Sequence, residues 1–303
     1  MLEAAQAEFD VTLRTETEGL TPPEAAEALV KYDAILPTLG DQFTGAAFGK
    51  QTKCKVLANF GVGFNHIDVT AATKAGVMVS NTPDVVTDAT ADIALTLILS
   101  TCRRAGEGER LVRAGRWDGW QPTHMLGTHV TGKRLGIVGM GRIGQAIAKR
   151  CHYGFDMPVI YFNRSPKTVD VPSRQVDTLD ALLSQSDIVV ITVPGGGDNT
   201  GLIDVDALAQ MQTTSVLINV ARGDVVDETA LIAALETGKI AGAGLDVFAQ
   251  EPYVPPALRV LENVVILPHL GTAALEIREA MGMMALENIR AWAKGAPLPQ
   301  LVE

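Results

Sequence analysis

Short hydrophobic runs alternate with helical stretches along the whole chain. Strands are predicted where β-branched and apolar residues cluster, and these runs form two series. The first series is Val11–Leu13, Ala34–Pro37, Val56–Asn59 and Val77–Ser80. The second is Leu135–Val138, Val159–Phe162, Ile188–Val193, Val216–Val220, Ala243–Val247 and Val264–Leu267. Because helical stretches separate successive strands, each series predicts a parallel sheet.

The predicted class is α/β with two domains, each built on a parallel doubly wound sheet. Residues 187–193 are almost continuously apolar, which is typical of a strand covered on both faces. Two linkers are expected, one at residues 81–83 and one at residues 271–272, each before a long helical segment. The chain would then hold a central domain, residues 84–272, inserted into a discontinuous one, residues 1–83 plus 273–303.

Composition narrows the function. The chain has 303 residues, 47% of them hydrophobic, which is enough for two cores. A formal charge of -10 argues against nucleic acid as a partner. The longest apolar run, Ile93–Leu99, is far short of the roughly 20 residues of a membrane span, so no membrane partner is expected. An acidic N-terminus without a secretory signal and three scattered cysteines favour the cytoplasm and no disulfide or metal site.

A glycine-rich turn follows the first strand of the second series. It comprises Gly139, Met140, Gly141, Arg142, Ile143 and Gly144, and a helix is predicted from Gln145 onward. The first glycine permits a tight turn, the second lets the backbone approach a pyrophosphate, and the third allows close packing of helix on strand. The N-terminus of the helix would offer N–H groups and partial positive charge to phosphates. This order predicts a dinucleotide-binding Rossmann domain.

The end of the next strand indicates which coenzyme is preferred. An Asp or Glu at this place would bind the adenosine ribose hydroxyls of NAD. The chain instead has Asn163, Arg164 and Ser165, without a carboxylate. Arg164 can pair with a 2′-phosphate, and its neighbours can donate hydrogen bonds to the phosphate oxygens. We therefore expect NADP(H) to be preferred and NAD(H) to be possible; the alternative is a solvated Arg164 beside an NAD site.

Three polar residues stand at successive strand-to-loop junctions of the second series: Arg222, Glu251 and His269. Each alone has an ordinary structural explanation. Together they offer a cation, a carboxylate and an imidazole at the edge where open sheets bind ligands. Reduction of a ketone by a coenzyme hydride needs a group that polarises the carbonyl and a group that supplies a proton. We expect Arg222 to do the first and His269 the second, with Glu251 favouring the imidazolium.

These motifs together resemble the family of D-isomer-specific 2-hydroxyacid dehydrogenases, particularly its glyoxylate and hydroxypyruvate reductase branch. The resemblance extends over nearly the whole chain. It is carried by residues 61–68, the glycine turn, residues 219–224, Glu251-Pro252, Pro268-His269 and Gly271-Thr272. It implies a central Rossmann coenzyme domain inserted into a flavodoxin-like substrate domain.

The resemblance also implies roles for further residues. The backbone N–H groups of Val62 and Gly63 would hold the substrate carboxylate opposite Arg222, and His269 would be the acid/base. Thr90 and Asp246 would face the nicotinamide. The other positions that would line the coenzyme are Val193, Pro194 and Ala221.

Family members are usually homodimers joined through the coenzyme domain. The segment Arg103–Leu126 resembles the dimerisation arm, with His124 directed at the neighbour's substrate pocket. In two places the chain differs from the family pattern. Met1 falls in what is expected to be the first helix, where relatives have an earlier strand, and Gly195–Asn199 replaces a Thr-containing loop.

The predicted function is transfer of hydride from NADPH to a small anionic 2-keto acid, such as glyoxylate or hydroxypyruvate, to give the D-2-hydroxy acid. One alternative is a nucleotide-sensing binding protein of the co-repressor type, because some relatives have that role. Another is a formate or phosphite dehydrogenase on the same scaffold.

Overall fold

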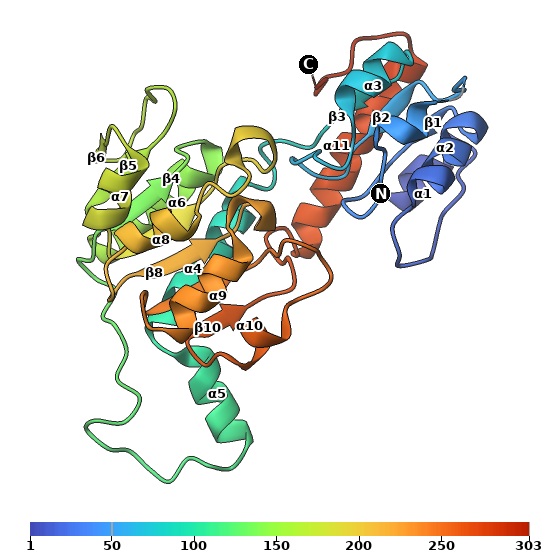
Figure 1. Ribbon diagram of the computed structural model, residues 1–303. Coiled ribbons are helices and arrows are strands. Elements are labelled where there is room, and N and C mark those ends of the chain that lie inside the picture. Colours follow the sequence, from blue (N-terminus) through green and yellow to red (C-terminus); the bar gives the residue numbers. More distant parts are fainter. Residues whose placement is uncertain (50, 303) are drawn as a thin grey trace. The chain divides into compact units, whose positions relative to one another are not determined.

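A computed structural model describes residues 1–49 and 51–302, which form two compact units (Figure 1). The first unit comprises Met1–Val86 and Ala273–Glu303, and the second Thr87–Thr272. The first boundary lies after Val86 rather than after residue 83, since the long helix of the second unit begins only at Thr87. The second unit is therefore inserted into the first.

The first unit contains a parallel sheet of three strands in the order β1-β2-β3. The strands are β1 (Ala34–Ile35), β2 (Val56–Ala58) and β3 (Met78–Ser80). Its helices are α1 (Leu2–Gln6), α2 (Pro22–Lys31), α3 (Val69–Lys74) and α11 (Leu275–Ala293). The last of these comes from the far end of the chain and packs on β2 (Figure 1).

Both faces of this small sheet are buried. Leu57 points into a cluster with Leu29 and Phe43, all fully buried. Its neighbours Val56 and Ala58 point the other way, where they meet Ala285 of α11. This alternation is what a strand produces when successive side chains project to opposite faces. Helices therefore cover the sheet on both sides, as the α/β prediction requires.

One predicted strand is wrong. Residues Val11–Leu13 form no strand, and the side chain of Leu13 is 59% exposed. Their alternation of apolar and polar residues suits a half-buried strand, but a strand needs a neighbour to pair with, and no described segment pairs with these residues. The sheet of the first unit accordingly has three strands rather than four.

The second unit contains a parallel sheet of seven strands in the order β10-β9-β8-β7-β4-β5-β6. The chain starts in the middle and winds outward in both directions, so the order reverses between β4 and β7. At such a switch point an open sheet forms a crevice for ligands. The strands are β4 (Leu135–Val138), β5 (Val159–Phe162), β6 (Ser173–Gln175), β7 (Ile188–Ile191), β8 (Val216–Asn219), β9 (Gly242–Leu245) and β10 (Val264–Ile266).

The six strands predicted for this sheet are all present, and the seventh, β6, was not predicted. It is polar, with the sequence Ser-Arg-Gln, and pairs with β5 at the edge of the sheet. Inside the sheet, Val189 and Leu217 point to one apolar cluster, while Val190 and Ile218 point to another on the opposite face. The continuous apolar runs thus reflect burial on both faces.

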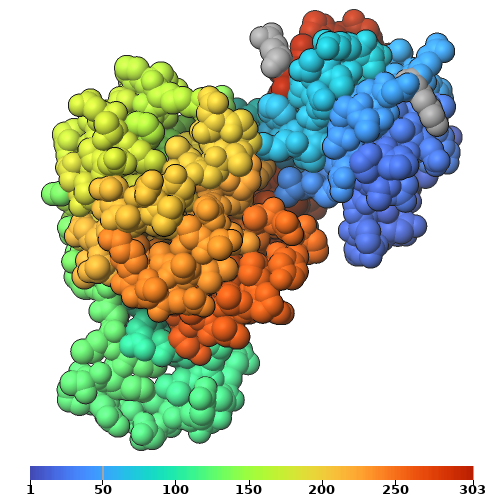
Figure 2. Space-filling view, viewed as in Figure 1, coloured from blue at the N-terminus to red at the C-terminus, as the bar shows by residue number. Residues whose placement is uncertain are grey.

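Helices flank this sheet on both sides, and one segment projects from it. The helices are α4 (Thr87–Cys102), α5 (Ala105–Arg113), α6 (Arg142–Phe155), α7 (Leu179–Gln185), α8 (Val205–Gln210), α9 (Glu228–Glu236) and α10 (Pro256–Val260). Helix α5 and the residues after it extend away from the body of the second unit (Figures 1 and 2). No helix within residues 1–49 and 51–302 is both long and apolar enough to cross a membrane.

Candidate functional site

The glycine turn lies between β4 and α6, at the switch point of the second sheet. Gly139 has a φ of +98°, and a Cβ there would stand 2.8 Å from Cγ1 of Val193. A Cβ on Gly144 would stand 2.4 Å from the carbonyl oxygen of Gly139. A Cβ on Gly141, by contrast, would meet nothing within 4 Å. The turn is therefore tightly packed at Gly139 and Gly144 and open at Gly141. The open position lets a pyrophosphate lie against the backbone.

The helix after this turn completes the phosphate-binding arrangement. Gly141 is the N-cap of α6, and Arg142 and Ile143 form its first turn. No side chain caps this end, so the N-terminus presents its partial positive charge to a ligand. Together the turn and the helix fit the diphosphate of NAD(P), and a bound coenzyme would supply the hydride.

Asn163, directly after β5, serves mainly as a structural link. Its Oδ1 accepts a hydrogen bond from the N–H of Met140 at 3.1 Å, and its Nδ2 donates to the carbonyl of Ser165 at 2.7 Å. The carboxamide thus ties the glycine turn to the loop after β5.

Arg164 faces the loop that differs from the family pattern. Its Nη2 donates to Oδ1 of Asn199 at 3.0 Å, and its Nη1 lies 3.6 Å from a carboxylate oxygen of Asp198. The Asn199 side chain is buried and donates in turn to the carbonyl of Pro194 at 2.9 Å. Although 66% exposed, the Arg164 side chain is therefore held on one side by a fixed carboxamide, a contact that sequence reasoning missed.

Arg222 follows β8 and carries an unused donor. Its Nη1 donates to the carbonyl of Ala221 at 2.6 Å, whereas its buried Nε has no hydrogen-bond partner in the described part of the chain. Burial lowers the pKa of Arg222, and the charges of Glu251 and Asp224 partly offset this. A guanidinium stays protonated in proteins, so the result is a desolvated cation. Such a group can bind an anionic ligand strongly.

Gly195 packs directly against this arginine. A Cβ at that position would come within 2.7 Å of Cγ of Arg222 and 2.6 Å of Oδ1 of Asp224. The other carboxylate oxygen of Asp224 accepts from the N–H of Gly196 at 2.7 Å. Val193 and Pro194, predicted to line the coenzyme, lead from β7 into this loop. The glycines therefore let the loop approach Arg222 closely.

Glu251 and His269 form a hydrogen-bonded pair. Nδ1 of His269 lies 2.7 Å from Oε2 of Glu251, and Oε1 of Glu251 accepts from the N–H of Phe248 at 3.0 Å. Burial acts to raise the pKa of Glu251, but the hydrogen bonds from His269 and Phe248 and the charge of Arg222 outweigh it, so the pKa is lowered from 4.5. The carboxylate is thus ionised at neutral pH and engages Nδ1, which leaves Nε2 of His269 for another partner.

The backbone of His269 is held by Asp246 from the end of β9. His269 has a φ of +54°, and its N–H donates to the carbonyl of Asp246 at 2.9 Å. The two carboxylate oxygens of Asp246 accept from the N–H groups of Leu270 at 2.7 Å and Gly271 at 2.8 Å. Burial raises the pKa of Asp246, and these two hydrogen bonds oppose the rise. Thr90 of α4 adds a hydrogen bond to the carbonyl of Gly271 at 3.1 Å.

Thr90 and Asp246 are expected from the sequence to face the nicotinamide; in the structure their side chains fix the His269 loop. No sequence signal pointed to this, because Thr90 lies far from Gly271 along the chain. The remaining predicted residues, Val62 and Gly63, lie in the first unit, in the loop after β2.

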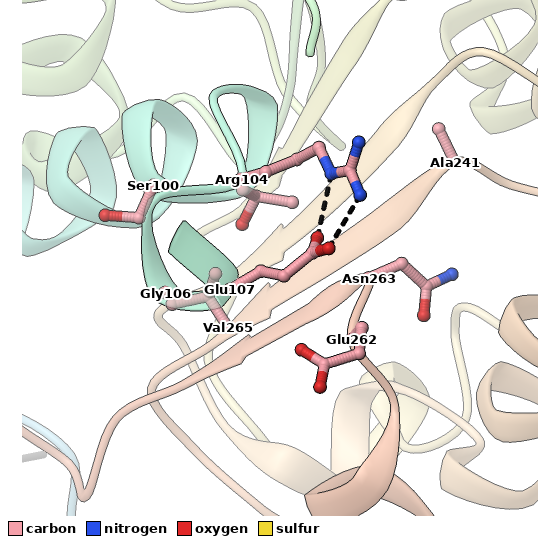
Figure 3. A pocket seen from close by; sticks show the side chains of 9 residues that line it. Ser100, Arg104, Gly106, Glu107, Ala241, Glu262, Asn263 and Val265 are labelled. Atoms are coloured by element: carbon pink, nitrogen blue, oxygen red, sulfur yellow. Dashed lines mark hydrogen bonds and ion pairs between the residues drawn. The ribbon is translucent and has the colours of Figure 1, made fainter. Parts of the chain in front are cut away.

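A cavity of about 240 Å³ elsewhere in the second unit is not the expected site (Figure 3). It lies beside Ala241 and Asn263, which precede β9 and β10, whereas Arg222 and His269 follow the carboxyl ends of strands. Two carboxylates line it, and Arg104 is paired with one of them, Glu107, at 2.7 Å. Such a lining does not favour an anionic substrate. Within the described residues, no group of three or more His, Cys, Asp and Glu side chains could hold a metal.

Comparisons with known proteins show the family to which the chain belongs. Residues 95–271 match the model of the D-isomer specific 2-hydroxyacid dehydrogenase, NAD binding domain. A glyoxylate reductase of Pyrococcus horikoshii is 41% identical over 309 aligned positions, covering 99% of this chain and 92% of the relative. A similar enzyme of Pyrococcus furiosus is 40% identical, covering 98% and 90%.

Two solved structures are also similar over the whole chain. A putative D-isomer specific 2-hydroxyacid dehydrogenase from Polaromonas has a TM-score of 0.92 at 40% identity, covering 100% of this chain and 95% of that one. The NADPH-dependent glyoxylate/hydroxypyruvate reductase of Sinorhizobium meliloti, in complex with NADP and malonate, has a TM-score of 0.89 at 34% identity, covering 99% and 92%. The resemblance and fold class predicted from sequence are thus confirmed, and the chain belongs to the D-isomer specific 2-hydroxyacid dehydrogenase family, as an NAD(P)-dependent oxidoreductase.

Proposed function

We propose that this protein is an NADPH-preferring reductase that converts glyoxylate, hydroxypyruvate or a similar small 2-keto acid to the D-2-hydroxy acid. The proposal rests on the contacts that Arg222, Glu251 and His269 make in the second unit. Arg222 is a desolvated cation with an unused Nε, and His269 has one nitrogen committed to Glu251 and the other available. This set provides one group for an anion and one for a proton.

In the proposed mechanism the reduced nicotinamide supplies the hydride. Arg222 binds the keto acid and polarises its carbonyl, so that negative charge developing on the oxygen is stabilised. His269 donates a proton from Nε2 to that oxygen. Glu251 keeps the ring oriented through Nδ1 and balances the charge of the imidazolium. Backbone N–H groups of Val62 and Gly63 hold the substrate carboxylate.

Preference for NADPH is supported by the loop after β5. Asn163, Arg164 and Ser165 include no carboxylate that would repel a 2′-phosphate. The guanidinium of Arg164 is steadied by Asn199 but remains mostly exposed, so it can contact a phosphate. The relative from Sinorhizobium meliloti is described as NADPH-dependent and holds NADP. On this basis the second unit binds the coenzyme, and the first contributes the carboxylate-binding loop.

We also propose that the protein is a homodimer joined through the segment Arg103–Leu126. Helix α5 has no buried residue, and large apolar side chains stay exposed along this arm. They are Val112 (59% exposed), Trp117 (57%), Trp120 (82%) and Leu126 (66%). Several large apolar side chains exposed along one projecting segment favour an interaction site there. A second copy would cover it, and the exposed His124 would then reach the neighbouring substrate pocket.

The test is a panel of 2-keto acids assayed with NADPH and with NADH by the loss of reduced-coenzyme absorbance. We expect turnover of glyoxylate and hydroxypyruvate, with a higher kcat/KM for NADPH. Tight NADPH binding without turnover of any small 2-keto acid would instead indicate a nucleotide-sensing protein. Oxidation of formate or phosphite without keto-acid reduction would indicate a dehydrogenase of those anions.

A further inference from the structure

The loop after β2 in the first unit has its carbonyl groups held by the side chains of two asparagines, Asn59 and Asn81. Asn59 is fully buried, and its Nδ2 donates to the carbonyl of Gly61 at 3.0 Å and to that of Gly63 at 3.1 Å. The carbonyl of Gly61 also accepts from the backbone N–H of Thr82 at 3.0 Å. One carboxamide therefore fixes two of three consecutive peptide groups.

The middle carbonyl is held separately. Nδ2 of Asn81 donates to the oxygen of Val62 at 2.9 Å. No other partner of this oxygen is found in the part of the chain that the structure describes. Asn81 is thus the one group that fixes the peptide between Val62 and Gly63, whereas the peptide before it has two anchors.

Fixing a carbonyl also fixes the N–H of the same peptide. A trans peptide is planar, and its C=O and N–H point in opposite directions. Because Asn59 holds the oxygen of Gly61 and Asn81 holds that of Val62, the N–H of Val62 is directed away from Asn59 and the N–H of Gly63 away from Asn81. Over residues 1–49 and 51–302, neither of these N–H groups has a hydrogen-bond acceptor. Two adjacent donors are thereby fixed and available to a carboxylate.

The two asparagines are themselves held in place by the sheet. Asn59 directly follows β2 and Asn81 directly follows β3, and these strands are paired in parallel. The donors are therefore ordered before any substrate arrives, so binding does not have to order the loop.

We propose that Asn59 and Asn81 are positioning residues, which hold the Val62 and Gly63 N–H groups in the direction needed to bind the carboxylate of the 2-keto acid. This inference rests on the proposed function. It identifies the side chains that determine the affinity of the protein for its 2-keto acid substrate. Asn81 has the larger effect, because the Val62 carbonyl has no second anchor, whereas Thr82 still holds Gly61 when Asn59 is replaced.

The experiment compares Asn81→Ala and Asn81→Asp with the wild type. Ala removes the side chain, and Asp keeps its size while losing the donor. Ser80→Ala is the matched control, since the Ser80 Oγ is buried one position away and has no partner in the described chain. Each variant is assayed with glyoxylate and with glycolaldehyde, an aldehyde without a carboxylate, and the KM for NADPH is measured alongside.

We expect both Asn81 variants to raise the KM for glyoxylate about tenfold or more, the scale of one hydrogen bond to a charged group. The KM for NADPH and the kcat/KM for glycolaldehyde should stay within about twofold, well below that effect, and Ser80→Ala should match the wild type. A purely structural role would instead raise both KM values and lower the kcat/KM for glycolaldehyde together.

An unchanged KM for glyoxylate, or equal losses with both aldehydes, overturns the inference. If Asn81→Ala does not fold, Asn81→Asp and Asn59→Ala provide the same comparison, with a smaller effect expected for Asn59→Ala. A wild-type protein that reduces no 2-keto acid refutes the proposed function instead, so the two failures are distinguishable.

Discussion

Replacing Glu251 with Gln tests the proposed proton donor most directly. Both carboxylate oxygens of Glu251 accept hydrogen bonds, one from Phe248 and one from His269. A glutamine has a single oxygen. If that oxygen stays with the Phe248 N–H, the amide NH₂ faces Nδ1 of His269, which must then accept, and an imidazolium is no longer supported. The opposite orientation places two donors against each other at Phe248.

The size of the effect follows from the burial of the pair. The side chains of Glu251 and His269 are 28% and 29% exposed, so their interaction is only partly screened by water. A hydrogen bond to a charged group under such conditions contributes about 1.5–3 kcal/mol. Lost from the transition state, this corresponds to a fall in kcat of roughly 10-fold to 150-fold.

The pH dependence should change as well. The pKa of Glu251 is lowered from 4.5, so the wild-type carboxylate is ionised from mildly acidic pH upward, and its stabilising interaction is lost only as pH falls through that lowered pKa. Glutamine has no group that ionises in this range. The acid decline of glyoxylate reduction that follows protonation of Glu251 should therefore be absent from Glu251→Gln.

The assay is kcat and KM for glyoxylate across pH, with NADPH saturating. Glu228→Gln is the matched control. Glu228, at the start of α9, accepts from the N–H of Ala249 at 3.3 Å, and within the described residues it has no hydrogen bond or ion pair with His269. A Glu251→Gln variant with wild-type kcat and an unshifted pH profile would refute the role assigned to the pair.

Three further outcomes are expected. Arg164→Ala should raise the KM for NADPH about tenfold or more while leaving that for NADH nearly unchanged, by loss of a charge-assisted contact; equal changes would contradict the 2′-phosphate assignment. Burial raises the pKa of the Cys54 and Cys102 thiols to about 11 and that of Cys151 to about 12. Since the thiolate is the reactive form, a thiol reagent at pH 8 should label the native protein slowly and label all three after denaturation; fast native labelling would be inconsistent with that burial. Replacing Trp117 and Trp120 with Ser should shift the protein from dimer to monomer in sedimentation, and an unchanged mass would exclude the arm as the interface.

The second sheet is well predicted from the sequence, because strands that are buried on both faces have continuous apolar runs. Its inner strands are almost entirely apolar, as in Ile188–Ile191, whereas β6 is polar and lies at an edge, so no pattern reveals it. Val11–Leu13 has a suitable alternation, but strand formation depends on a partner that local sequence does not specify.

In the candidate site, too, some features follow from the sequence and others do not. Arg222, Glu251 and His269 can be proposed from the sequence because each lies in a segment that follows a predicted strand. The side chains that hold these residues or their neighbours in place cannot be predicted in this way, because the contacts join positions that are distant in the sequence. Asn199 reaches Arg164 across 35 residues, and Thr90 reaches Gly271 across 181. Such pairs become visible only when the sheet has brought the loops together.

The contact between Gly195 and Arg222 restricts how this loop can be redesigned. Grafting a loop from another dehydrogenase usually replaces residues after the strand as one block. Here any side chain at position 195 would strike the arginine or Asp224, while Gly197, with no atom near its absent Cβ, leaves room for one. Because φ at Gly197 is +54°, Asn or Asp would be the first residues to try there. A loop library that keeps Gly195 and varies position 197 should therefore retain activity more often than one that varies both.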